Sequence, residues 1–166
     1  MSGLLLHELK QTKPFASPEL EAFLNLVRST DLIHREAQAI LKAFGLSQAQ
    51  YNILRILRGA GPDGLSCSEL GTRLVTFDPD VTRLLDKLEA RGLVIRSRDS
   101  SDRRVVTVRA TVPGTTLASD VALDQQLLAC HRKQFSALSP EQLAHLIDLL
   151  ERLRQPSLAT TSPSQE

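Results

Sequence analysis

Arginine and lysine residues are concentrated in one stretch of the chain, and their chemistry suits contact with phosphate. Between Thr82 and Arg109 the sequence has eight cationic side chains and four carboxylates, a local excess of +4. The formal net charge of the whole chain is only +1. Whole-chain electrostatics therefore predict no polyanionic partner, whereas this stretch carries the local excess that contact with nucleic-acid phosphates requires.

The remaining residues of chemical interest do not form a catalytic or metal-binding pattern. The histidines lack the HxxxH or HExxH spacing of metal ligands, and no paired Cys or acidic cluster completes a site; they are His7, His34, His131 and His145. Nucleophile elbows, phosphate-binding loops and dinucleotide fingerprints are also missing from the sequence. We therefore predict a protein that is not an enzyme and holds neither metal nor cofactor.

Two cysteines, Cys67 and Cys130, are far apart and lack CxxC spacing, which argues against a disulfide scaffold. Cys67 falls just inside a predicted helix, where the positive helix end can lower a thiol pKa and favour oxidant sensing. A buried structural thiol is the alternative for both residues, and the one the sequence favours.

Helix-capping signals place the elements before the basic stretch. Ser17 and Pro18 predict the start of a long helix over residues 17–46. Capping boxes, Ser47 with Gln50 and Ser66 with Glu69, predict a second helix and a short third one. Asp78 as N-cap and Pro79 as first residue predict a fourth helix, which carries the first cations of the basic stretch and stops at Gly92.

The pattern then changes from helix to strand and back. β-branched runs in 93–98 and 103–109 flank the polar turn 99–102, which predicts a hairpin. A long helix is expected from about Thr115 to Phe135, followed by a final helix capped by Ser139.

These elements predict a mainly α fold with a small β-hairpin wing, a winged helix-turn-helix. One domain is expected, with a DNA-binding lobe at 47–111. The flanking helices, 17–46 and 113–155, are too long and too apolar to stand alone, so pairing with a second copy is expected. The ends, 1–16 and 156–166, are predicted to be flexible.

The run DVTRLLDKLEARGLVIRSRDSSDRRVVTV (80–108) resembles the recognition helix and wing of the MarR family of multiple-antibiotic-resistance regulators. The helix order matches over roughly residues 20–154. The wing carries the family's Asp-x-Arg as Asp102-Arg103-Arg104, and residues 110–114 stand where the family has LT-x-x-G. The resemblance implies a homodimeric regulator of a pseudopalindromic DNA operator, usually a repressor, released by a small aromatic or phenolic effector.

By position in that family, Thr82, Arg83 and Lys87 are expected to face the major groove, with Arg83 contacting guanine or phosphate. The resemblance places Arg104 in the minor groove and makes Asp102 the residue that shapes the turn. Arg103 is then a backbone contact or a substitute for Arg104.

Three more positions are candidate binding residues. Ser66 and Ser68, at the start of the third helix, are expected to donate hydrogen bonds to phosphate. His34 falls in the region that borders the effector pocket in the family, so it is a candidate lining residue; an ordinary, partly exposed histidine is the alternative.

The start of the fourth helix departs from the family, which often has small polar residues where this chain has Phe77, Asp78, Pro79 and Asp80. Both carboxylates fall where DNA would approach. Either they cap the helix, or they accept a hydrogen bond from a cytosine amino group, or the helix end stands off the groove.

The predicted fold is also compatible with a function other than DNA binding. A winged helix can also mediate protein–protein association without DNA, and the acidic helix start gives that alternative its support. The sequence shows no signal peptide and no apolar stretch long enough for a membrane span, so a soluble cytoplasmic protein is expected.

Overall fold

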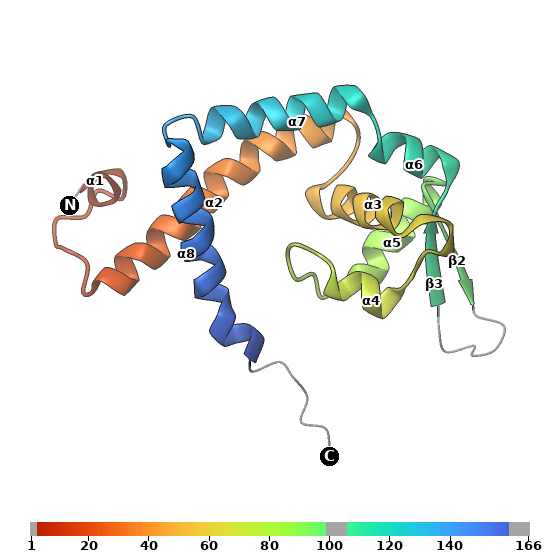
Figure 1. Cartoon of the computed structure of the whole chain (residues 1–166), viewed down its shortest axis with the longest axis horizontal. Coiled ribbons are helices and arrows are strands. Elements are labelled where there is room, and N and C mark those ends of the chain that lie inside the picture. The colour runs from red at the N-terminus through yellow and green to blue at the C-terminus, as the bar shows by residue number, and fades with distance from the viewer. Residues whose placement is uncertain (1–2, 99–105, 160–166) are drawn as a thin grey trace, which may run out of the picture. The chain divides into compact units, whose positions relative to one another are not determined.

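The chain divides into two units, Met1–Leu127 and Leu128–Glu166, in a computed structural model that describes residues 3–98 and 106–159. The first unit contains a three-stranded antiparallel sheet with helices around it, and its elements are labelled in Figure 1. It carries every described residue of the predicted DNA-binding lobe.

The first two long helices begin where the capping signals predict. Helix α2 (Pro18–Ala43) is capped by Ser17, whose Oγ accepts a hydrogen bond from the Leu20 N–H at 3.3 Å. Helix α3 (Gln48–Ala60) has both bonds of the capping box between Ser47 and Gln50, at 3.0 and 3.2 Å. Satisfying these end N–H groups with side chains fixes where each helix starts.

Two short helices follow, and the start of the second differs from the prediction. Helix α4 (Cys67–Thr72) is capped by Ser66 as expected. Helix α5 (Val81–Ala90) is capped by Asp80, so the predicted cap Asp78 and helical Pro79 were wrong. The cause is local, because the Asp78 side chain accepts from the Asp80 N–H at 2.8 Å and closes a turn before the helix.

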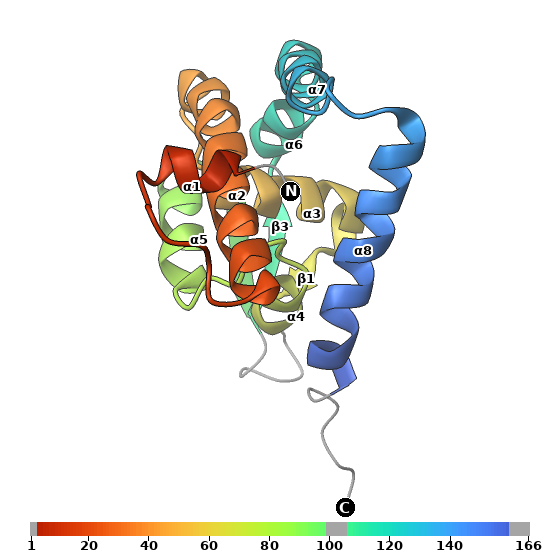
Figure 2. The same cartoon turned by 90° about the vertical axis from the view of Figure 1, so that its left-hand side faces the viewer.

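The sheet contains the predicted hairpin and one strand that was not predicted. Strands β2 (Val94–Arg98) and β3 (Val106–Ala110) pair antiparallel, with Val94 opposite Ala110 and Arg98 opposite Val106. Strand β1 (Leu65–Ser66) pairs with the other edge of β3, giving the order β1-β3-β2. Figure 2 labels β1 and β3 of this sheet.

The long helix predicted from Thr115 to Phe135 is interrupted, so that prediction was wrong. Helix α6 (Val112–Ala118) begins earlier, because Thr111 caps it by accepting from the Gly114 N–H at 3.1 Å. Helix α7 (Val121–Gln134) starts afresh, with Asp120 accepting from the Leu123 N–H at 2.9 Å. A proline is compatible with the first turn of α6, since the N–H groups there have no helical partner.

The chain ends contain more helix than expected. Helix α1 (Leu4–Glu8) lies in the predicted flexible start and buries Leu5, and a 3₁₀ turn η1 (Gly61–Asp63) precedes β1. In the second unit, helix α8 (Pro140–Ala159) runs past the predicted end, and Ser139 and Gln142 form its predicted capping box. None of the described helices is long and apolar enough to cross a membrane.

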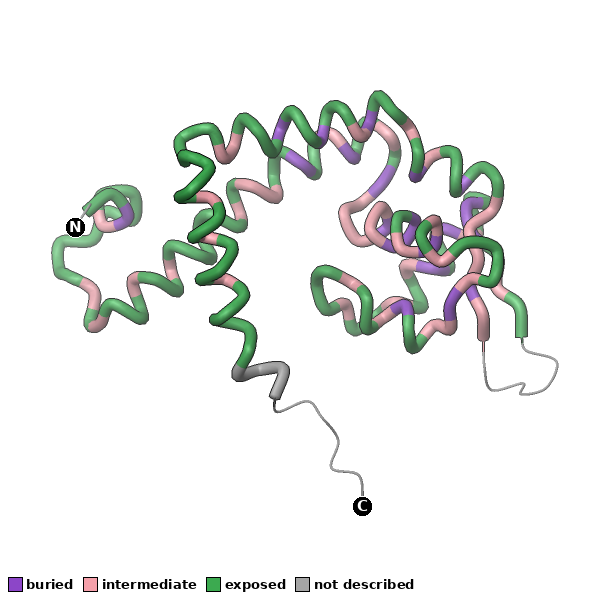
Figure 3. The backbone as a smooth tube through the Cα atoms, viewed as in Figure 1, coloured by how far each residue is buried: buried purple, intermediate pink, exposed green. Residues whose placement is uncertain are grey.

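Aliphatic side chains from nearly every element of the first unit form its core. Fully buried side chains come from α3, α4, α5 and the sheet, among other elements, and buried segments are purple in Figure 3; the fully buried side chains include Ile53, Leu54, Leu57, Leu70, Leu85, Leu88, Val94 and Val108. This burial holds α5 against the sheet, so its opposite side faces outward with a defined orientation.

Candidate nucleic-acid interface

The predicted recognition helix α5 has one buried and one exposed side. Leu85 and Leu88, three residues apart, are fully buried in the core. The predicted contact residues Thr82, Arg83 and Lys87 are all exposed. The structure therefore brings these three side chains together on the outward side of one helix.

Among the described residues, no ion pair involves Arg83 or Lys87. Together with Leu84, Asp78 and Asp80 they line a hollow of about 170 Å³, which we call the α5 hollow. Asp80 caps α5 and Asp78 holds the preceding turn, so each carboxylate has a local structural role. Helix capping therefore accounts for Asp80 and the turn for Asp78, although both still lie beside the two cations.

Arg96, one of the cations of the basic stretch, is hydrogen-bonded to other residues of the lobe. Its guanidinium donates to the Glu89 carboxylate at 2.9 and 2.6 Å and also to Asp86. The backbone N–H of Arg96 donates to the Glu89 carboxylate at 3.0 Å. These bonds join β2 to α5. Hydrogen bonding to Arg96 lowers the pKa of the Glu89 carboxyl, and bonding to Glu89 and then Asp86 raises the pKa of Arg96.

Two further cations of the stretch also have internal partners. Arg91 donates to the Gly45 carbonyl at 2.6 Å, and Arg109 donates to the Pro62 carbonyl at 3.0 Å and to Ser97 Oγ at 2.6 Å. Arg98, by contrast, is exposed at the end of β2. The local charge excess therefore overstated how many cations face outward, because several of them connect elements of the lobe.

The two predicted serines differ in their surroundings. Ser66 is half-buried, and its Oγ accepts from the Glu69 N–H at 3.1 Å, while Glu69 itself pairs with Arg73 rather than completing the capping box. Ser68 is exposed on α4. Ser68 is therefore the more accessible of the two predicted phosphate donors.

The predicted wing residues Asp102, Arg103 and Arg104 lie outside the described residues, and their roles stay predictions. The strands on either side are paired up to Arg98 and Val106.

Cys67 is half-buried at the start of α4, and it forms no disulfide with Cys130. Burial raises the pKa of its thiol, while the charge of Arg96 and a backbone hydrogen bond act more weakly in the opposite direction. The helix start therefore does not make Cys67 a low-pKa thiol. Within residues 3–98 and 106–159, no group of three or more His, Cys, Asp or Glu side chains is placed to hold a metal ion.

A second hollow, of about 410 Å³, lies beside α3, and we call it the α3 hollow. Its lining combines an aromatic ring, a cation, amides and aliphatic groups; the residues are Gln48, Ala49, Tyr51, Asn52, Arg55, Ile56, Val75 and Thr76. The predicted effector residue His34 is half-buried on α2 and is not among them.

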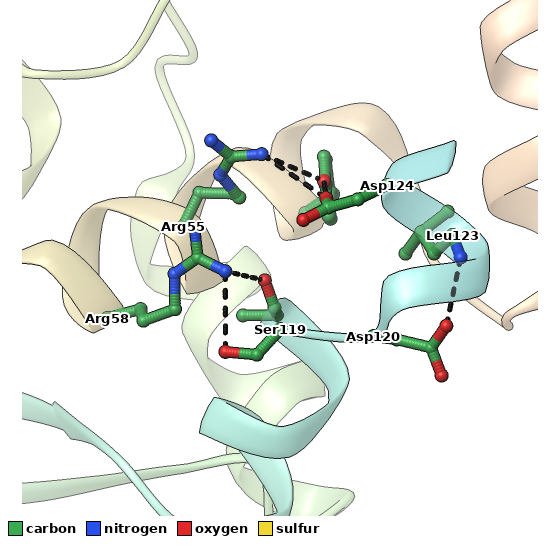
Figure 4. Close-up of polar contacts among 8 residues, drawn as sticks. Arg55, Arg58, Ser119, Asp120, Leu123 and Asp124 are labelled. Atoms are coloured by element: carbon green, nitrogen blue, oxygen red, sulfur yellow. Dashed lines mark hydrogen bonds and ion pairs between the residues drawn. The ribbon is translucent and has the colours of Figure 1, made fainter. Parts of the chain in front are cut away.

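The polar contacts of this region connect α3 with α7 (Figure 4). The Tyr51 hydroxyl donates to Asp124 Oδ1 at 2.7 Å, and Arg55 donates to Tyr51 Oη at 3.2 Å and to Asp124 at 3.4 Å. The Arg55 guanidinium also lies 5.7 Å from the centre of the Tyr51 ring. Burial raises the pKa of Tyr51, so its hydroxyl is a proton donor at neutral pH.

Sequence reasoning missed this cluster. The Tyr51–Arg55 spacing of four along a helix was visible, but Asp124 is 73 residues away in the chain. One turn further along α3, Arg58 donates to the Ala118 carbonyl and, at 3.3 Å, to Ser119 Oγ. Two arginines of α3 therefore hold the junction between α6 and α7, on either side of the interruption.

Two short helices, α4 and α5, followed by the β2–β3 hairpin define a winged helix-turn-helix, a class of fold that places its second helix in the major groove of DNA. The family model described as "MarR family" matches residues 46–106.

Relatives match most of the chain. The HTH-type transcriptional regulator PecS of Dickeya dadantii (strain 3937) is 30% identical over 131 residues, covering 78% of this chain and 78% of PecS. YkoM, an HTH-type transcriptional regulator of Bacillus subtilis (strain 168), is 28% identical over 142 residues, covering 83% and 90%. The crystal structure of a MarR transcription factor from Planctomyces limnophilus is similar with a TM-score of 0.64 and 39% identity, covering 83% of this chain and 98% of that one.

The chain belongs to the MarR family of HTH-type, DNA-binding transcriptional regulators, as its sequence resemblance predicted. Its relatives are regulators of transcription and not enzymes.

Proposed function

We propose that the protein is a homodimeric repressor that binds a pseudopalindromic operator and is released by a small aromatic or phenolic effector. The observation that supports it most directly is the outward side of α5, where Thr82, Arg83 and Lys87 are exposed and the two cations have no ion-pair partner among the described residues. Cations that are not committed internally are available to phosphates and to guanine.

Within this proposal the contacts divide by chemistry. Arg83 contacts guanine or phosphate and Lys87 contacts phosphate, while Thr82 lies beside them against the groove. The exposed Ser68 donates a hydrogen bond to the phosphate backbone, and the half-buried Ser66 is the second donor. In the wing, Arg104 or Arg103 enters the minor groove and Asp102 shapes the turn.

Dimer formation is supported by apolar side chains exposed on α2. Leu20, Phe23 and Val27 recur at helical spacing along it and are all exposed, with Phe23 at 58% and Val27 at 51%. Exposed apolar residues also recur on α8, including Ile147 and Leu153. Contiguous exposed apolar helix faces are typical of association surfaces, and a symmetric dimer covers the same face on both copies.

Two relatives add support by what their names state. A mutant of Escherichia coli MarR has been solved in complex with operator DNA, and its fold matches this chain with a TM-score of 0.72 at 23% identity. The homoprotocatechuate degradative operon repressor of Escherichia coli is 30% identical over 112 residues. Operator binding and repression are thus known modes of action among proteins similar to this one.

Selection of bound duplexes from random DNA tests the DNA-binding part of the proposal. We expect a two-fold related site whose half-site centres are about 10 base pairs apart, since two recognition helices of a dimer enter successive turns of one groove. Sedimentation of the complex is expected to give two chains per duplex, and transcription from a promoter overlapping the site is expected to fall when protein is added. Recovery of no preferred sequence, with the affinity insensitive to salt, would contradict the proposal and favour protein–protein association.

The α3 hollow is our candidate effector site. Its size falls within the range of small-molecule pockets, and Arg55 is the one cation in its lining, beside the Tyr51 ring and aliphatic Ile56 and Val75. A carboxylate or phenol oxygen that accepts from Arg55 competes with Asp124 for the same donor. Such a ligand would loosen the contact of α3 with α7, which offers a route from effector to DNA-binding lobe.

Phenolic ligands are documented for proteins of this fold. NadR has been solved in complex with 4-hydroxyphenylacetate, and the regulator RdhR in its 2,4-dichlorophenol-bound form, with TM-scores of 0.65 and 0.79 to this chain. Their identities of 24% and 19% show a common fold. These ligands agree with the chemistry of the α3 hollow, where a cation lies with an aromatic ring and aliphatic groups.

Calorimetry with benzoate, phenol and 4-hydroxyphenylacetate as probes tests the effector site. We expect saturable binding of an acidic probe to the wild type, and a reduction of about tenfold or more in affinity for Arg55→Ala, because a charge-assisted hydrogen bond is removed. Arg35→Ala is the matched control, since Arg35 is an exposed arginine on α2 outside the hollow. Equal binding by both variants would show that the ligand sits elsewhere.

A further inference from the structure

Phe77 is the most exposed large apolar side chain among the described residues, at 90%, and it lies four residues before the first residue of α5, Val81. Val75, two residues earlier, is exposed at 82%. An aromatic ring left in water forgoes a large hydrophobic gain, so an exposure this complete at a binding surface points to a partner that covers the ring.

The backbone around Phe77 is held on both sides. Before it, the Val75 N–H donates to Asn52 Oδ1 of α3 at 2.9 Å. After it, Asp78 accepts from the Asp80 N–H, and Asp80 caps α5. The segment is therefore anchored to α3 and to α5, and the ring is presented outward from a fixed position.

Asp78 and Asp80, which follow Phe77 closely in the chain, line the α5 hollow together with Arg83 and Lys87. Phe77 therefore directly precedes, along the chain, the residues that line the outward side of α5. The residues at the N-terminal end of a recognition helix are those that approach base edges in the major groove. The carboxylates of Asp78 and Asp80 repel phosphates, so this end of the surface suits base edges and not the DNA backbone.

We propose that Phe77 is a specificity-determining residue that packs against a thymine 5-methyl group in the major groove of the operator. This inference rests on the proposed operator binding. The methyl group is the apolar feature that a base pair offers in the major groove, and phenylalanine is among the side chains that contact it. A requirement for thymine at one position of each half-site follows.

Replacing the thymines of the selected operator by deoxyuridine, one at a time, removes only the methyl group. At one position of each half-site, wild-type affinity is expected to fall by about fourfold, the equivalent of one buried methyl. Phe77→Ala is expected to bind thymine and uracil equally at that position. Val112→Ala is the matched control, since Val112 is exposed at 82% and lines neither hollow. It is expected to keep the wild-type difference, and thermal unfolding of both variants should match the wild type because both side chains are exposed.

The outcomes separate this inference from the proposed function. If the wild type selects an operator but Phe77→Ala keeps the same uracil sensitivity, Phe77 does not contact a thymine methyl and operator binding stands. If Phe77→Ala instead changes the sedimentation of the free protein and not its thymine preference, the ring contacts a second copy and the inference is wrong. If the wild type selects no operator, both proposals fail.

Discussion

The double variant Arg83→Ala, Lys87→Ala is expected to bind the selected operator about 100-fold or more weakly than the wild type at physiological salt. Removing an arginine that bonds to a base costs about 1–3 kcal/mol, and removing a lysine that pairs with phosphate weakens binding to every sequence. The dependence of the logarithm of affinity on the logarithm of salt concentration should become shallower by about 0.9 for each phosphate that the variant no longer neutralises. Fluorescence anisotropy over a salt series measures both effects.

The fold of this double variant is expected to be unchanged, because both side chains are exposed and neither has an ion-pair partner among the described residues. Arg35→Ala, on the exposed side of α2, is the control for removal of a surface arginine. Sedimentation should give the same oligomer for all three proteins. If the double variant kept wild-type affinity and salt dependence, α5 would not be the element that contacts DNA.

Local signals in the sequence predicted the helix starts well because the interactions that define them are local. The caps of α2, α3, α4 and α8 each involve residues three positions apart. The predicted start of α5 was wrong, and the cause is equally local. Two aspartates compete for the capping position, and the sequence pattern favoured Asp78 with Pro79. In the structure Asp78 forms the turn and leaves the cap to Asp80.

Elements defined by distant partners could not be predicted. Strand β1 has only two residues, and it is a strand because Leu65 and Ser66 pair with Val108 and Thr107 of β3. The interruption between α6 and α7 carries no proline, and two of its anchors come from Arg55 and Arg58 of α3. Periodicity cannot reveal either contact, because neither belongs to one helix or one hairpin.

The same limit applies to the candidate site. Counting charges along the chain predicted a DNA-binding stretch, but the count gave every cation in it the same weight. Arg91, Arg96 and Arg109 are hydrogen-bonded within the first unit, whereas Arg83 and Lys87 face outward. The difference depends on partners such as Gly45 and Pro62, which lie 46 and 47 positions away. Tertiary structure therefore decides which cations of a basic segment are available to DNA.

Gly114 is where the close packing of α6 against the sheet leads to the largest expected effect on stability. It lies in the first turn of α6 and is buried. A Cβ added to Gly114 would lie 1.9 Å from the carbonyl oxygen of Leu93 and 2.9 Å from the carbonyl carbon of Leu93. The Leu93 carbonyl also accepts from the Thr111 N–H at 3.1 Å, so the backbone cannot move away without breaking the hydrogen bond that holds the capping residue of α6.

Gly114→Ala is therefore expected to lower the free energy of unfolding by about 3 kcal/mol or more, the upper range for overpacking, because backbone atoms must separate. Gly59→Ala is the matched control: Gly59 is also helical, near the end of α3, but no atom lies within 4 Å of an added Cβ. Alanine there should raise the stability by about 0.5 kcal/mol, since the unfolded chain loses freedom. Denaturant unfolding of the three proteins at one concentration measures these differences. Because the same substitution at two helical glycines is predicted to act with opposite signs, a decrease of equal size at both positions would mean that the packing of α6 against Leu93 is not the cause.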